Sequence, residues 1–84
     1  MKTFELTQEQ AEEVREYIKG KTEDFNLLFV SVTLVKTNEE NVYFIKTCTI
    51  PKEFEDTSFL MDDANATQRI LNDTESYIYN EIYK

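Results

Sequence analysis

The sequence contains no histidine and no tryptophan, and it has one glycine, one proline and one cysteine. Without histidine, the chain lacks the side chain that most often serves as a general base and as a metal ligand near neutral pH. One glycine excludes the glycine-rich loops that bind nucleotide phosphates. Cys48 has no intramolecular disulfide partner, and it falls on a strand position that points to the core, which predicts a buried, unreactive thiol. We therefore expect no enzyme, no metal site and no cofactor.

Basic residues are also scarce, since nine Lys and Arg stand against seventeen Asp and Glu, for a formal charge of −8. Binding to nucleic acid or to an anionic membrane needs Lys and Arg to neutralise phosphates, so this balance argues against both. A polyelectrolyte partner would have to be basic. The bias toward Lys, Glu, Asn, Ile and Tyr is typical of an AT-rich genome, such as that of a low-GC bacterium or its phage.

Long apolar runs are missing as well. No segment approaches the roughly 20 apolar residues of a membrane-spanning helix, and the first residues lack the apolar stretch of a signal peptide. We therefore expect a soluble, cytoplasmic protein. The chain has 84 residues, of which 40% are hydrophobic, and this is enough to form one folded domain over residues 1–84.

The first part of the chain predicts a short strand followed by a helix. Phe4 points to one side of a strand over residues 3–6, together with Leu6. Thr7 and Gln10 have the spacing of a capping box, and apolar residues then recur at helical intervals. We expect this helix to cover residues 8–19 and to end at Gly20, where a left-handed residue is favoured.

The middle of the chain predicts a β-hairpin, because two runs rich in Val, Phe and Thr flank a polar connector. A three-residue loop closed by Asn41 in the left-handed region would pair residues whose numbers sum to 80. The even positions would then form the core face, with Phe44 at its centre and Val32 next to Cys48. The even positions concerned are Leu28, Val30, Val32, Leu34, Val42, Phe44, Lys46, Cys48 and Ile50.

The last third is less regular. Residues 52–61 are compatible with a helical turn, a short strand at 58–61 or a packed loop. A final helix follows, capped by Asp62, Asp63 or Asn65. Its predicted inward stripe consists of Ala66, Ile70, Leu71, Thr74, Ile78 and Ile82, flanked by Tyr77, Tyr79 and Tyr83.

Together these patterns predict a two-layer α+β fold. An antiparallel hairpin, alone or extended by residues 3–6 as a third strand, packs against an N-terminal and a C-terminal helix.

The excess of Asp and Glu is the feature of the sequence that bears on function. Surface carboxylates keep a small protein soluble, but two acidic surfaces could also present charge to a basic groove, as proteins that imitate nucleic acid do. This favours a non-enzymatic inhibitor of a basic, nucleic-acid-handling protein, of the kind made by phages or mobile elements. The two candidate patches are Glu12, Glu13 and Glu16, and Glu53, Glu55, Asp56, Asp62 and Asp63.

An alternative interpretation uses the second face of the hairpin. Apolar residues at its end, with a tyrosine of the last helix, would make a self-associating or accessory protein, for example a homodimer. The residues concerned are Val35, Tyr43, Ile45 and Tyr79.

Overall fold

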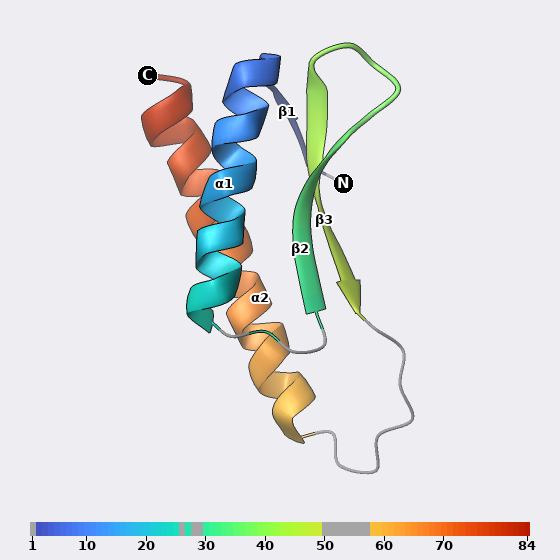
Figure 1. The fold of residues 1–84 in the computed structure, drawn as a ribbon, viewed down its shortest axis with the longest axis vertical. Helices are drawn as coiled ribbons and strands as arrows, with labels where there is room; N and C mark the ends of the chain where they lie inside the picture. Colours follow the sequence, from blue (N-terminus) through green and yellow to red (C-terminus); the bar gives the residue numbers. More distant parts are fainter. Residues whose placement is uncertain (1, 26, 28–29, 50–57) are drawn as a thin grey trace.

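Three strands and two long helices form two layers (Figure 1). A computed structural model describes residues 2–25, 27, 30–49 and 58–84, and the side chains of these residues other than those at 49 and 58–63. The strands form one antiparallel sheet in the order β1-β3-β2, and both helices cover the same side of it. This confirms the α+β prediction and the third strand. The elements are β1 (Thr3–Glu5), α1 (Gln8–Phe25), β2 (Val30–Lys36), β3 (Val42–Thr49), α2 (Ser58–Tyr77) and a π-helical turn, η1 (Ile78–Ile82).

Helix α1 begins with the predicted capping box. The Thr7 amide donates to Gln10 Oε1 at 2.9 Å, and the Gln10 amide donates to Thr7 Oγ1 at 3.2 Å. The predicted end at Gly20 is wrong, because α1 continues to Phe25. A glycine inside a helix costs about 1 kcal/mol, and the packing of Phe25 against the core offsets that cost.

The hairpin register differs from the prediction by one residue. The Thr37 amide donates to the Val42 carbonyl at 2.9 Å, so the loop contains the four residues 38–41 rather than three. Asn41 is left-handed as predicted, with φ at 62°. Paired residues therefore sum to 79, as in Val32 with Thr47.

A slip of one residue turns every side chain of a strand to the opposite face. Tyr43 is therefore buried in the core, 4% exposed, and Ile45 packs against it. Phe44 is only half-buried, on the outer face beside Val35, and Cys48 is exposed. The predictions that Phe44 centres the core and that Cys48 is buried are wrong.

The core lies between the sheet and the helices. Along α2 and η1 the buried stripe contains Ile70, Thr74 and Ile78 as predicted, together with Thr67, while Ala66 is half-buried. Helix α2 begins at Ser58, before the predicted caps. The hydrophobic core residues are Phe4, Leu6, Ala11, Val14, Ile18, Val32, Leu34, Tyr43, Ile70 and Ile78.

The C-terminal end is joined to the first strand. In η1 the Tyr83 amide donates to the Ile78 carbonyl at 2.9 Å. The Tyr83 hydroxyl then accepts from the Glu5 amide at 2.9 Å and donates to the Glu5 carbonyl at 3.0 Å. One side chain thus satisfies both outward backbone groups of Glu5, as a neighbouring strand would.

Candidate interaction surfaces

The first predicted acidic patch lies on the solvent side of α1. Ala11, Val14 and Ile18 turn toward the core, so the glutamates at the intervening positions point outward. All four of these glutamates are exposed: Glu9, Glu12, Glu13 and Glu16. We call Glu9, Glu13 and Glu16, which follow one another at intervals of four and three residues, the α1 acidic face.

The α1 acidic face keeps its charge uncompensated. Glu12 pairs with Arg15, whose Nη1 lies 3.1 Å from Glu12 Oε1. Within the described part of the chain, no Lys or Arg forms an ion pair with Glu9, Glu13 or Glu16. The sequence alone did not separate Glu12 from its neighbours, although the spacing of Arg15 three residues later was a signal for the pair.

Glu13 is held in place by α2. The Tyr77 hydroxyl donates to Glu13 Oε1 at 2.7 Å, and the Tyr77 ring stacks on Tyr17 with centroids 4.2 Å apart. The bond to Glu13, with burial as the next cause, raises the pKa of Tyr77 to about 12. The phenol therefore stays neutral at physiological pH, and its hydrogen bond orients the carboxylate without cancelling the negative charge.

The second predicted patch is only partly visible. Asp62 and Asp63 belong to α2, whereas Glu53, Glu55 and Asp56 lie outside the described residues. The later carboxylates of the helical layer are paired. Asp73 lies 3.5 Å from Lys21, Glu81 lies 3.7 Å from Lys84, and Glu75 pairs with Lys2 and raises the pKa of that lysine.

Charge is divided unequally between the two layers. Helix α1 carries six carboxylates against three basic side chains, and residues 58–84 carry five against two. Residues 26–50, which include β2 and β3, carry two of each sign. The negative charge therefore concentrates on the helical layer, and the sheet is close to neutral.

The alternative apolar surface does not exist as predicted. Val35 lies on the outer face of the sheet, whereas Tyr43 and Ile45 face the helices. Tyr79 is 46% exposed, but its ring packs edge-on against Phe4, with centroids 6.2 Å apart. The register thus places Val35 on the opposite face of the sheet from Tyr43 and Ile45.

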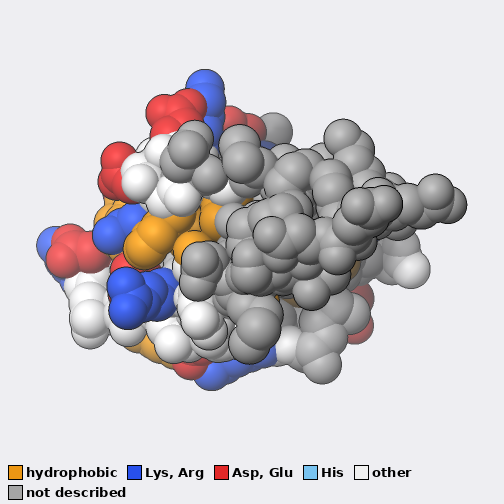
Figure 2. Space-filling view, turned by 90° about the horizontal axis from the view of Figure 1, so that it is seen from below, with side chains coloured by type: hydrophobic (Ala, Val, Ile, Leu, Met, Phe, Trp, Pro, Cys, Tyr) orange, Lys and Arg blue, Asp and Glu red, His pale blue; other side chains and the backbone are white. Residues whose placement is uncertain are grey.

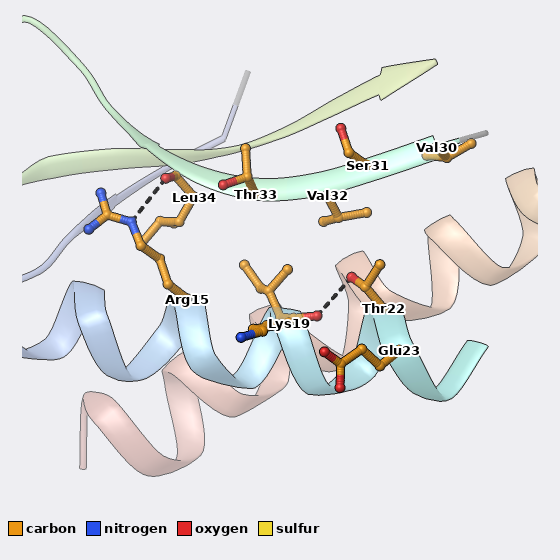
Figure 3. A pocket seen from close by; sticks show the side chains of 10 residues that line it. Arg15, Lys19, Thr22, Glu23, Val30, Ser31, Val32, Thr33 and Leu34 are labelled. Atoms are coloured by element: carbon orange, nitrogen blue, oxygen red, sulfur yellow. Dashed lines mark hydrogen bonds between the residues drawn. The ribbon is translucent and has the colours of Figure 1, made fainter. Parts of the chain in front are cut away.

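A surface that the sequence analysis missed lies between α1 and β2. A groove of about 360 Å³ runs along the outer edge of β2, with Val32 and Leu34 directed toward α1 (Figure 3). Arg15 reaches across it and donates from Nε to the Leu34 carbonyl at 3.3 Å. The sequence places Arg15 and Leu34 nineteen residues apart, so only the packing of α1 on β2 brings them together.

Among the described residues there is no group of three or more Cys, Asp and Glu arranged to hold a metal ion. In the same part of the chain, no helix has the length and apolar character needed to cross a membrane.

Comparisons with models of known protein families, with curated proteins and with solved structures find no match to this chain.

Proposed function

We propose that this protein is a non-enzymatic binding protein whose α1 acidic face occupies the nucleic-acid site of a basic protein and thereby inhibits it. The observation that carries the proposal is the set of three exposed glutamates on one helix face without a basic partner in the described structure. We place this activity in the cytoplasm of a bacterium, with a phage or mobile element as the source.

The spacing of the charges supports this function. Glu9 and Glu16 are seven residues apart, which is about 10.5 Å along an α-helix. One strand of B-DNA places a phosphate about every 3.4 Å of helix axis, or about four from one end of that length to the other. The α1 acidic face presents three carboxylates over the same length, so its charge density along the helix axis approaches that of one DNA strand.

The rigidity of the face adds to this support. Helix α1 is anchored by the fully buried Val14 and Ile18, and Glu13 is oriented by Tyr77. Charges that are already positioned lose little conformational entropy on binding. A fixed negative surface also accelerates association with a positively charged partner.

Self-association through Val35, Tyr43, Ile45 and Tyr79 has less support, because Tyr43 is buried and lies on the opposite face from Val35. No other observation favours that function.

A competition experiment tests the proposal. The protein is titrated into purified bacterial nucleic-acid-binding proteins, each holding a fluorescent DNA or RNA, and anisotropy reports displacement. The α1 variant is E9Q/E13Q/E16Q. The control is E5Q/E39Q/E40Q, which removes the same charge from exposed positions on the sheet layer.

We expect displacement from at least one protein, weakening steeply between about 50 and 500 mM salt because screening shortens the range of electrostatic attraction. The α1 variant should lose at least about tenfold in affinity, and the control should lose much less. Displacement that is insensitive to salt, or that both variants weaken equally, would contradict mimicry through α1.

A further inference from the structure

The two edges of the sheet differ in how far their outward backbone groups are hydrogen-bonded. At the β1 edge, Tyr83 satisfies both outward backbone groups of Glu5. At the β2 edge, the contact between Arg15 and the Leu34 carbonyl is the one side-chain hydrogen bond to the outward groups in the described structure. An edge with unpaired backbone groups is a template for another strand.

The register shows which groups of β2 are free. Thr37 bonds to Val42 in β3, and hydrogen-bonding direction alternates along a strand. The odd residues of β2 therefore bond to β3, and the even residues point their amides and carbonyls outward, as the Arg15 contact to Leu34 shows. The backbone groups of Val30 and Val32 point to the outer edge without a protein partner in the described residues.

The groove beside these groups can accept side chains. Its apolar floor contains the half-buried Val30 together with the buried Ile18, Val32 and Leu34, and it extends along β2 from Val30 to Leu34, about 13 Å of extended chain. Seen from the end where α1 stops, apolar side chains reach the surface between Lys and Arg side chains (Figure 2). A strand added to β2 would direct every second side chain into this apolar floor.

The charges of the groove are ordered along its length. Arg15 lies at the Leu34 end, Lys19 lies in the middle, and Glu23 lies toward the Val30 end (Figure 3). Arg15 is already engaged by Glu12, whereas Lys19 is exposed and has no ion-pair partner in the described structure. Lys19 is therefore the group that can pair with a carboxylate of a ligand. Glu23 repels a ligand carboxylate at the Val30 end of the groove.

We propose that the β2 edge and the α1–β2 groove bind an extended peptide segment of a partner protein by antiparallel strand addition. An apolar side chain of the peptide packs against the half-buried Val30 and against Val32, which is 8% exposed. A carboxylate two residues earlier in the peptide pairs with Lys19, since residues two apart share one side of a strand.

A second copy of this chain fits the groove less well than a peptide does. The inward face of its own β2 is already covered by its own α1, so it has no free side chains to place in the groove. Two copies joined at this edge would also bring two α1 helices together, each with three more carboxylates than basic groups.

This proposal is independent of the α1 acidic face and is tested separately. A phage-displayed library of random twelve-residue peptides is selected on the full-length protein, and enriched peptides are synthesised. We expect a shared pattern of Asp or Glu two positions before an apolar residue. With a saturating synthetic peptide, hydrogen exchange measured by NMR should slow at least about tenfold at the Val30 and Val32 amides.

Charge reversal supplies the matched control. K19E should weaken peptide binding at least about tenfold. K46E, which reverses an exposed lysine on the outer sheet face, should leave it within about twofold, and so should E9Q/E13Q/E16Q.

The proposal is overturned if no peptide is enriched, if enriched peptides bind without protecting Val32, or if K19E and K46E behave alike. Analytical ultracentrifugation of the free protein adds one further outcome. A dimer whose Val32 amide is protected without peptide would make the occupant a second copy and overturn the peptide proposal.

Discussion

Thr74 offers a sharp test of the core packing. It lies on α2 between Ile70 and Ile78, is 0% exposed, and its hydroxyl has no hydrogen-bond partner in the described part of the chain. A threonine inside a helix often donates to the carbonyl four residues earlier, as Thr22 does to Ile18 at 2.8 Å. Thr74 makes no such bond. Its hydroxyl therefore lost its hydrogen bonds to water on folding and gained none within the protein.

The substitution Thr74→Val keeps the branched shape and replaces the hydroxyl by a methyl group. A buried hydroxyl without a partner costs about 1–3 kcal/mol. Thr and Val have similar helix propensities, so the backbone contributes little. We expect Thr74→Val to stabilise the protein by about 1–2 kcal/mol, which raises Tm by roughly 4–8 °C for each kcal/mol in a domain of this size.

Urea unfolding followed by circular dichroism at 222 nm, with thermal unfolding beside it, measures the change. Thr22→Val is the matched control, because the same substitution there removes a hydrogen bond to Ile18. It should be neutral or destabilising by up to about 1 kcal/mol. A Thr74→Val protein that is no more stable than the parent would refute the reasoning, because the Thr74 hydroxyl would then have to be satisfied in solution.

The hairpin register and the tyrosine contact give the remaining predictions. Tyr43→Ala should lower the free energy of unfolding by about 3 kcal/mol and Phe44→Ala by about 1–2 kcal/mol, since the first side chain is buried and the second is half-buried. A lower urea midpoint for Phe44→Ala than for Tyr43→Ala would place Phe44 in the core instead. Cys48 should react with a thiol reagent in the folded protein at a rate within about tenfold of that in denaturant, and strong native protection would contradict its exposure. The bond to Glu13, with burial as the next cause, raises the pKa of Tyr77 from 10.0 to about 12, so the contribution of this contact to stability is complete below pH 10 and is lost as pH rises through 12. The stability difference between the parent and Tyr77→Phe, measured by urea unfolding, should therefore fall between pH 10 and 12, and a constant difference would contradict the contact.

The local signals in the sequence were reliable where one short segment decides the structure. The Thr7–Gln10 box starts α1, Asn41 adopts the left-handed conformation, and Phe4 and Leu6 both point into the core. Each of these depends on residues a few positions apart. The exposure of Glu12, Glu13 and Glu16 followed in the same way from the apolar positions between them.

The hairpin register could not be read from the sequence, because both faces of β3 are plausible core faces. Val42 and Phe44 are apolar on one face, and Tyr43 and Ile45 on the other. The four-residue loop and the helices decide between them. Tyr43 pairs with the buried Phe4 of β1, and its ring lies 5.8 Å from the Arg15 guanidinium, a contact that requires α1 in place.

The sequence by itself determined an acidic, folded α+β chain with exposed glutamates on its first helix, because composition and helical period act locally and need no partner segment. Tertiary structure decided which face of β3 is buried, which carboxylates form ion pairs with Lys or Arg, and which edge of the sheet is left open. Each of these depends on side chains far apart in the chain, such as Arg15 with Leu34 and Tyr83 with Glu5. Their meeting depends on how the helices pack on the sheet, which no local pattern specifies.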